Sequence, residues 1–154
     1  MTRVLFVCLG NICRSPIAEG WLRHLALQRD LAIEVDSCGT ISMHEGNRPD
    51  QRSIDVMRSA GVDIALQRSR PICAEDFLRF DHILVMDGSN LSDVLALLGD
   101  VNTGGQVARL LLGGGAGADG CDVPDPYYGG DDGFIAVRDL VRAGTERWLD
   151  REGF

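Results

Sequence analysis

A short segment near the N-terminus constrains the fold more than any other part of the chain. Residues 2–7 form a β-branched and apolar run that predicts a buried strand, and residues 16–28 carry apolar side chains at helical spacing. Only residues 8–15 separate the two. Because a loop between a strand and a helix N-terminus aims its backbone N–H groups at one point, this segment predicts an anion-binding loop.

Local chemistry predicts how that loop turns into the helix. Ser15 is expected to cap the helix, Pro16 suits its first position, and the Glu19 carboxylate favours its positive end. Gly10 is expected to let the loop turn tightly and approach a ligand. Because no Gly-Lys-Ser/Thr follows, the loop is not of the nucleotide-binding type, and a tetrahedral oxyanion such as phosphate is the expected ligand.

The rest of the chain alternates between strand and helix signals. Further strands are predicted at 33–37, 82–86 and 106–111; helices are predicted at 52–59, 74–79, 90–98 and 133–149, with a loop over 112–125. Gly61 and Gly99 are the expected helix stops. This order predicts an α/β fold in one three-layer domain, residues 1–154. Its parallel sheet is covered by helices on both faces, and the anion loop follows the first strand.

Composition narrows the function classes. The net charge of -8 disfavours a nucleic-acid partner, and no window offers the roughly 20 apolar residues that a membrane span needs. The N-terminal apolar run is too short for a signal peptide. The five cysteines are odd in number and scattered, which disfavours a disulfide-stapled secreted domain. They show no zinc-ligand spacing, so no metal or cofactor is expected, and the expected location is the cytoplasm.

The side chains of the loop point to nucleophilic chemistry. Cys8 stands at its entrance, where the helix N-terminus, the loop amides and Arg14 each favour a thiolate over a thiol. The planar fork of Arg14 can grip two phosphate oxygens. Ser15 can hydrogen-bond the sulfur of Cys8, and Asn11 can brace the loop through its amide.

A leaving group must also be protonated. Asp125 is the candidate acid, held between Pro124 and Pro126, which stiffen the backbone around it. Tyr127 and Tyr128 follow and can form an aromatic wall that suits an aromatic leaving group.

At this point the chain resembles the low-molecular-weight protein tyrosine phosphatases. Residues 7–16 (VCLGNICRSP) resemble that family's phosphate-loop signature, and residues 125–129 (DPYYG) resemble its general-acid loop. Residues 37–40 and 80–90 match further family segments in the same order. The resemblance covers nearly the whole chain.

The resemblance implies a four-stranded parallel sheet and hydrolysis of phosphotyrosine and small aryl phosphates, with no metal. It implies Cys8 as the nucleophile that forms a phosphocysteine, Arg14 as the phosphate binder, and Asp125 as acid and then base. The other residues that it implies for the phosphate loop are Leu9, Gly10, Asn11, Ile12, Cys13 and Ser15. Ser37 and Gln67 are implied to support the loop, and the implied substrate walls are Leu9, Ile12, Met43, Tyr127 and Tyr128.

Two positions depart from the family pattern. Met43 stands where an aromatic residue is usual, and it can pack against a ring only loosely. Gln67 stands where the family often has a histidine that hydrogen-bonds the loop asparagine. These departures are expected to affect the choice of substrate more than the chemistry of hydrolysis.

The resemblance also makes Cys13 a second loop cysteine that can form a reversible disulfide with Cys8, which predicts a redox-sensitive enzyme. Cys38, Cys73 and Cys121 are expected to be structural or surface residues. The expected partners are a phosphotyrosine-containing protein, for which a tyrosine kinase is one candidate, and phosphate or another oxyanion in the site.

Several residues have a simpler expected role. His44 is expected to be a solvated loop residue, the pair Asp131 and Asp132 a solvated turn, and one of Tyr127 and Tyr128 a core aromatic. Two other functions stay open from the sequence. A thioredoxin-coupled arsenate reductase shares the fold and loop, but it needs two further redox cysteines close together. A phosphoprotein-binding module without turnover would be expected to have lost Cys8 or Asp125.

Overall fold

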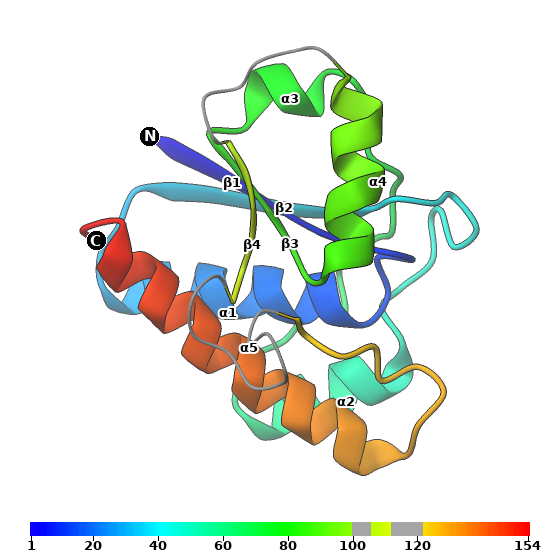
Figure 1. The fold of residues 1–154 in the computed structure, drawn as a ribbon. Helices are drawn as coiled ribbons and strands as arrows, with labels where there is room; N and C mark the ends of the chain where they lie inside the picture. Colours follow the sequence, from blue (N-terminus) through cyan, green and yellow to red (C-terminus); the bar gives the residue numbers. More distant parts are fainter. Residues whose placement is uncertain (100–105, 112–121) are drawn as a thin grey trace.

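A computed structural model describes residues 1–99, 106–111 and 122–154 (Figure 1). The described chain alternates between strands and helices in the predicted order. Its elements are β1 (Thr2–Cys8), α1 (Arg14–Gln28), β2 (Ile33–Gly39), α2 (Gln51–Ser59), α3 (Asp76–Arg79), β3 (His82–Val85), α4 (Gly88–Leu98), β4 (Val107–Arg109) and α5 (Asp131–Arg151).

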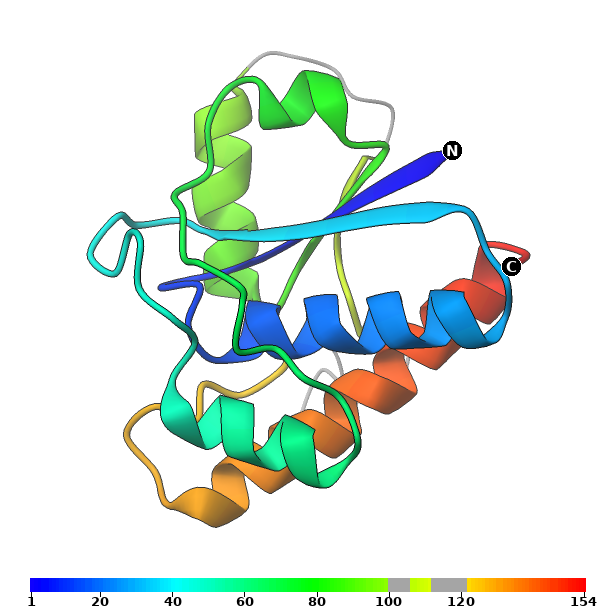
Figure 2. The same ribbon diagram turned by 180° about the vertical axis from the view of Figure 1, so that it is seen from behind.

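The strands form one parallel sheet of four in the order β2-β1-β3-β4. Helices α1, α2 and α5 lie on one side of this sheet and α3 and α4 on the other, as the two opposite views show (Figures 1 and 2). The α/β fold with a four-stranded parallel sheet covered on both faces is therefore confirmed. Because β1 is flanked by β2 and β3, its carboxyl end opens in the middle of the sheet edge, where parallel sheets bind ligands.

Strand β1 belongs to both hydrophobic cores. Val4, Phe6 and Cys8 pack into the core under α1 and α5, whereas Leu5 and Val7 pack into the core on the α4 side. All five are at most 2% exposed. Successive side chains of a strand point to opposite faces, so a continuous apolar run is what a central parallel strand requires. The burial fixes the position at which the chain leaves β1 and begins the loop at Cys8.

All five helices of the described residues begin within two residues of the predicted starts, and two of these starts change the role of a named residue. Helix α1 begins at Arg14, and no side chain of the described residues caps it, so Ser15 lies inside the helix instead of at its N-cap. The reason is that the Ser15 hydroxyl is used by the loop. Asp131 and Asp132 form the first turn of α5 rather than a solvated turn, and their charge suits the positive end of that helix.

The predicted helix stops are confirmed. Gly61 and Gly99 follow α2 and α4 with φ angles of 85° and 63°, a region that side chains rarely adopt. Strand β4 is shorter than predicted, although Leu110 and Leu111 beyond it are buried. Most of the loop predicted at 112–125, and Cys121 with it, lies outside the described residues.

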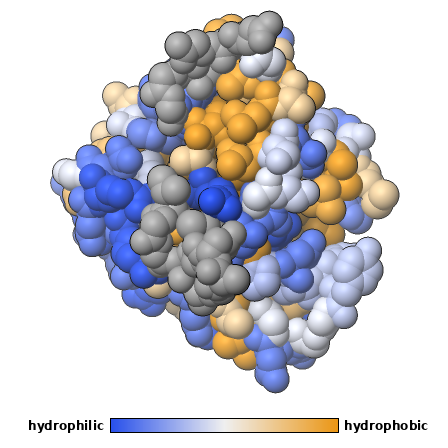
Figure 3. Space-filling model, viewed as in Figure 1, coloured by the Kyte–Doolittle hydropathy of each residue, from blue (hydrophilic) through white to orange (hydrophobic). Residues whose placement is uncertain are grey.

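The surface of the described residues is uneven in polarity. On the face shown in Figure 3, hydrophobic residues gather around α4, where Leu95 and Leu97 are exposed. Polar residues cover much of the remainder of this face.

Candidate active site

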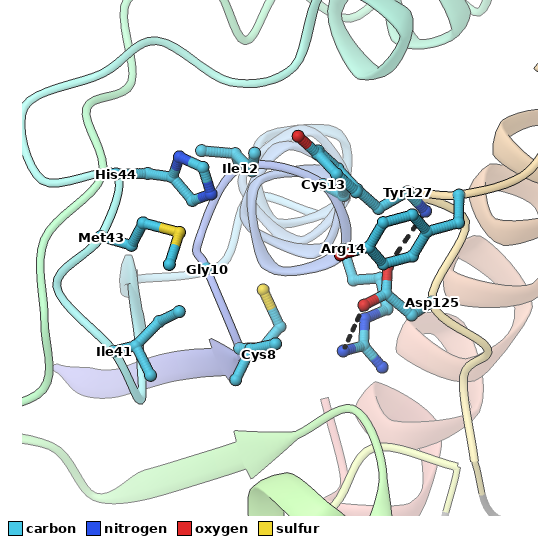
Figure 4. A pocket seen from close by; sticks show the side chains of 12 residues that line it. Cys8, Gly10, Ile12, Cys13, Arg14, Ile41, Met43, His44, Asp125 and Tyr127 are labelled. Carbon is cyan, nitrogen blue, oxygen red and sulfur yellow. Dashed lines mark hydrogen bonds and ion pairs between the residues drawn. The ribbon is translucent and has the colours of Figure 1, made fainter.

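A cavity of about 210 Å³ opens at the carboxyl end of β1. The Cys8 sulfur points into it from one end and the Arg14 guanidinium lies beside Asp125 at the other, with Met43 and His44 on the opposite wall (Figure 4). The lining residues come from the loop after β1, from the segment after β2, and from the segment before α5. They are Cys8, Leu9, Gly10, Ile12, Cys13, Arg14, Ile41, Met43, His44, Asp125, Tyr127 and Tyr128.

The Cys8 thiol is tied into a buried hydrogen-bond network. Its Sγ lies 3.0 Å from the Ser15 hydroxyl, which in turn accepts a 2.7 Å bond from the Asn11 amide. The Ser15 hydroxyl has one hydrogen, which can go to the Cys8 sulfur or, in a longer 3.4 Å bond, to the Cys38 carbonyl oxygen. The same side-chain NH₂ of Asn11 also donates to Ser37 Oγ at 3.0 Å. The side-chain oxygen of Asn11, Oδ1, accepts a 3.1 Å bond from the backbone N–H of Arg70.

The loop turns at Asn11, not at Gly10. Asn11 has a φ of 56°, the left-handed conformation that asparagine tolerates better than most residues. Gly10 is needed for a different reason. A Cβ atom there would lie 2.9 Å from Cδ2 of His44, so glycine lets the segment after β2 close over the loop.

The network ends on a buried carboxylate. Ser37 donates to Glu19 Oε1 at 2.8 Å, and Arg23 donates to Glu19 Oε2 at 2.7 Å. Burial raises the pKa of Glu19 above its ordinary value, although the bonds from Ser37 and Arg23 oppose this. The helix-end role expected for Glu19 is therefore secondary, because its side chain anchors the support of the phosphate loop.

Arg14 is a buried cation that carboxylates hold in place. Its side chain is 3% exposed, and its Nη1 donates to Asp87 Oδ2 at 2.6 Å and to the Val123 carbonyl at 2.9 Å. Nη2 lies 3.7 Å from Asp125 Oδ2. Burial alone would lower the pKa of Arg14, but Cys8, Asp87 and Asp125 outweigh it and raise the pKa. The guanidinium is therefore a permanent positive charge at the cavity floor.

Asp125 lies at the cavity edge with its side chain 39% exposed. Its Oδ1 accepts a 3.1 Å bond from the backbone N–H of Tyr127, which leaves Oδ2 facing Arg14 (Figure 4). Tyr127 and Tyr128 meet edge to face with ring centres 5.0 Å apart. Neither tyrosine packs inward as expected, because Tyr127 is 38% and Tyr128 94% exposed.

Comparisons with known proteins agree with this geometry. The family model described as low molecular weight phosphotyrosine protein phosphatase matches residues 3–152. The chain belongs to this family. A relative of that name from Schizosaccharomyces pombe is 42% identical over 137 residues, which cover 86% of this chain and 85% of the relative. The low molecular weight protein-tyrosine-phosphatase YfkJ of Bacillus subtilis is 38% identical over 151 residues, which cover 97% of this chain and 94% of the relative.

Solved structures show the same likeness. The protein tyrosine phosphatase of Entamoeba histolytica, crystallised with Hepes in its active site, superposes with a TM-score of 0.90 at 34% identity, covering 99% of this chain and 97% of that one. The structure of B. subtilis YfkJ gives a TM-score of 0.88 at 36% identity and covers 100% of this chain and 98% of that one. The chain is thus a low-molecular-weight protein tyrosine phosphatase, a family with a cysteine-based mechanism.

In this phosphatase the other cysteines differ from Cys8 in their surroundings. The pKa of the Cys13 thiol is raised to about 12, mainly by burial and secondly by the negative charge of the nearby Asp50. Burial also raises the pKa of Cys38 well above its ordinary value, and Cys38 belongs to the core on the α4 side. Cys73 is exposed, and among the described residues no disulfide is present.

One predicted contact of the phosphatase loop is replaced. Gln67 was expected to support the loop by bonding Asn11, but its amide donates to the Pro16 carbonyl at 3.1 Å. The Asn11 side chain makes its bonds with Ser15, Ser37 and Arg70 instead. A glutamine side chain reaches the first turns of α1 here, because the segment after α2 runs alongside that helix (Figure 2).

Sequence reasoning missed three residues of the phosphatase site. Asp87 lies two residues beyond the end of strand β3, near the carboxyl edge at which parallel sheets place ligand-binding groups, and this could have identified it. Ile41 and His44 line the cavity from an irregular segment that has no periodicity to read, so no sequence signal was available. His44 is partly buried there instead of solvated.

No helix among the described residues is both long and apolar enough to cross a membrane. No cluster of three or more His, Cys, Asp or Glu side chains among them could hold a metal ion.

Proposed function

We propose that this phosphatase hydrolyses phosphotyrosine, and small aryl phosphates, through a phosphocysteine on Cys8. The observation that carries the proposal is that the Cys8 sulfur, Arg14 and Asp125 line one cavity. Uncapped backbone N–H groups at the start of α1 add donors for phosphate oxygens. The rim of Leu9, Ile12 and the two tyrosines offers apolar surface to a phenyl ring.

In the first step the Cys8 thiolate attacks phosphorus, and the bond from phosphorus to the ester oxygen breaks. Arg14 and the loop N–H groups bind the phosphoryl oxygens, where negative charge must be stabilised in the transition state. Asp125 gives its proton to the departing phenolate. The products are the free phenol and a phosphoryl group bonded to sulfur.

In the second step Asp125, now a carboxylate, removes a proton from water as its oxygen attacks phosphorus. The phosphorus–sulfur bond breaks and inorganic phosphate forms. The Ser15 hydroxyl, 3.0 Å from Sγ, stabilises the departing thiolate. Asp87 suits the acid role less well, because both of its oxygens already accept hydrogen bonds, from Arg14 and from the N–H of Asn90.

The test is turnover of p-nitrophenyl phosphate and a phosphotyrosine peptide by purified protein. Cys8→Ser should abolish turnover, Asp125→Ala should reduce kcat by roughly 10²- to 10⁴-fold, and exposed Cys73→Ser should act like the parent enzyme. Mass spectrometry of acid-quenched protein should find one phosphoryl group on the peptide that contains Cys8. Turnover that survives Cys8→Ser would overturn the proposal, as would thiol-dependent arsenate reduction without phosphatase activity.

We propose a phosphotyrosine-containing protein as the substrate, with an autophosphorylated tyrosine kinase as the first candidate. Met43 lines the cavity and is 77% exposed, so it offers apolar surface to residues that flank a phosphotyrosine. A pull-down with the Asp125→Ala variant, competed by vanadate, should retain phosphotyrosine proteins. Retention that vanadate does not compete would count against the site as the point of capture.

We also propose that peroxide inactivates the enzyme reversibly. Peroxide oxidises the Cys8 thiolate to a sulfenic acid, and the Cys13 thiol then displaces water from it to form a disulfide. Because the pKa of Cys13 is about 12, bridge formation should accelerate as pH rises. Mass spectrometry after mild peroxide should find a Cys8–Cys13 bridge that dithiothreitol reverses; sulfonic Cys8 beside free Cys13 would contradict the mechanism.

We place this activity in the cytoplasm and in one domain, residues 1–154. Free thiols are typical of a reducing compartment, and the cysteines of the described residues are free. Both hydrophobic cores pack on the same sheet, which supports a single folding unit. Fractionation of cells and a single unfolding transition in urea test the two points.

A further inference from the structure

The guanidinium of Arg52 reaches from α2 to the segment that carries Asp125. We call residues 124–130 the acid loop. Nη2 of Arg52 donates to the Tyr127 carbonyl at 3.1 Å, and Nη1 donates to the Gly129 carbonyl at 3.2 Å. Two charge-assisted bonds to carbonyls two residues apart restrain the path of a loop, and its glycines offer no stiffness of their own.

Arg52 is itself held firmly. Asp50 accepts from its Nε and Nη2, both at 3.0 Å, in the two-point geometry that fixes a guanidinium plane. The guanidinium also lies 4.3 Å from the ring centre of Phe134, which is fully buried, and 5.7 Å from that of Tyr127. The side chain is only 33% exposed, so it is a built part of the structure and not a mobile surface cation.

The same unit is anchored to the phosphate loop. The backbone N–H of Asp50 donates to the Ile12 carbonyl at 2.7 Å. Asp50 and Arg52 therefore form a bridge that joins the loop carrying Cys8 to the acid loop. At the far end of the bridge, the N–H of Tyr127 holds Asp125 Oδ1 while the carbonyl of Tyr127 is held by Arg52. A shift of Tyr127 must therefore move the Asp125 carboxylate.

We propose that Arg52 is a positioning residue that sets the distance between the proton donor Asp125 and the phosphate bound at Cys8. Arg52 is not among the residues that line the cavity, so its effect must pass through the acid loop. The inference rests on the proposed role of Asp125. Its consequence is selective, because loss of Arg52 weakens protonation of the leaving group and leaves the attack by Cys8 intact.

The experiment uses Arg52→Met, which keeps an apolar stem against Phe134 but removes the donors and the charge. Arg52→Lys, which keeps the charge but loses the fork, is the second variant in case the first does not fold. The matched control is Arg58→Met in the same helix, where Arg58 is 61% exposed and pairs with Asp55 at 3.7 Å. Thermal melting of each variant establishes that it is folded.

The readout is kcat/KM, which reports the first chemical step, for aryl phosphates with leaving groups of increasing basicity. In Arg52→Met, kcat/KM for p-nitrophenyl phosphate should stay near the parent value, because its leaving group needs little protonation. For phenyl phosphate and phosphotyrosine it should fall by about 10- to 100-fold, the size expected when a proton donor is misplaced. Arg58→Met should match the parent across the series.

Asp125→Ala and the double variant Arg52→Met/Asp125→Ala separate the two inferences. If Arg52 acts through Asp125, the double variant loses no more than Asp125→Ala alone. Equal losses for all leaving groups, no loss in Arg52→Met, or additive losses in the double variant would each overturn the positioning role. If Asp125→Ala itself shows no dependence on the leaving group, the failure lies in the proposed acid and not in Arg52.

Discussion

Asp87 holds Arg14 with one carboxylate oxygen and the first turn of α4 with the other. Oδ2 accepts from Arg14 Nη1 at 2.6 Å, and Oδ1 accepts from the N–H of Asn90 at 2.8 Å. A single side chain thus ties the phosphate-binding cation to a helix on the opposite face of the sheet. The pair joins residues 73 positions apart in the sequence.

Replacing Asp87 with Asn separates these two tasks. Asparagine caps helices about as well as aspartate, so the start of α4 should be kept, and a fall in melting temperature reports only the lost bond to the buried Arg14. The charge-assisted bond to Arg14 is lost, and such bonds contribute about 1.5–3 kcal/mol, so kcat/KM should fall by roughly 10- to 100-fold. The inhibition constant of inorganic phosphate should rise in parallel. Tighter phosphate binding would mean that Asp87 weakens Arg14 by neutralising it instead of orienting it.

Gly39 is the position where the sheet leaves no room beside the phosphate loop. A Cβ atom there would lie 2.7 Å from the Leu9 carbonyl oxygen and 3.2 Å from the Asn11 backbone nitrogen. Because these atoms are backbone, Gly39→Ala must displace the loop. We expect activity to fall by at least about 10²-fold, with stability reduced by about 1–3 kcal/mol.

Gly88→Ala is the control for this substitution, because its added Cβ meets only a side-chain atom, at 3.8 Å. Urea unfolding and p-nitrophenyl phosphate turnover measure the two effects. Full activity in Gly39→Ala would show that the loop adapts at little cost.

Cys13 should resist alkylation in the folded enzyme. Burial and the nearby Asp50 raise its pKa to about 12, so very little of it is thiolate at pH 8, whereas the Cys8 sulfur points into the open cavity (Figure 4). Iodoacetamide at that pH should therefore label Cys8 and leave Cys13 unmodified, as peptide mass spectrometry can establish. In Cys8→Ser, Cys13 should still stay unlabelled until the protein is unfolded in urea. Rapid labelling of native Cys13 would contradict the effect of burial.

Asp76 should make stability sensitive to acid. Burial alone would raise its pKa, but the two bonds from Arg70 and the N–H of Cys73 outweigh burial and lower the pKa below the ordinary 3.8. A carboxyl whose pKa is lower in the folded state stabilises the fold above its unfolded pKa. That contribution is lost as pH falls through the folded value.

Asp76→Asn should therefore reduce the free energy of unfolding by about 2 to 3 kcal/mol at pH 7. The difference from the parent should shrink below about pH 4. Urea titrations at several pH values measure it, with exposed Asp93→Asn as the control. A difference that stays constant down to pH 3 would show that the pair with Arg70 is not the cause.

Much of the architecture is readable from local patterns. The apolar run of β1 and the loop after it were predicted from residues 2–16, because strand period and loop length are properties of neighbouring residues. Gly61 and Gly99 were predicted to end their helices for the same reason, and both predictions are confirmed. The error at the start of α1 shows the limit, since Ser15 has the chemistry of a cap but its hydroxyl is taken by Cys8 and Asn11.

The candidate site was predicted only where motifs mark it. Cys8, Arg14 and Asp125 are predicted from the chemistry of their local segments and again from the resemblance, whereas neither source predicts the roles of Asp87, Arg52 and His44. Each of these three acts across the fold, on Arg14, on the acid loop and over Gly10 respectively. The resemblance implies Asn11 as the partner of Gln67, but the Gln67 amide reaches the Pro16 carbonyl, because a resemblance does not say which of two nearby polar groups a side chain contacts.

The sequence by itself determined the order of strands and helices and an anion-binding loop that begins at Cys8. Only the tertiary structure decided that Asp125 faces Arg14, that Asp87 holds Arg14, and that Arg52 joins the phosphate loop to the acid loop. The physical reason is the distance along the chain between the residues that interact. Backbone conformation follows from side chains within about one helical turn or strand pair, whereas these contacts exist only after two cores have packed on one sheet.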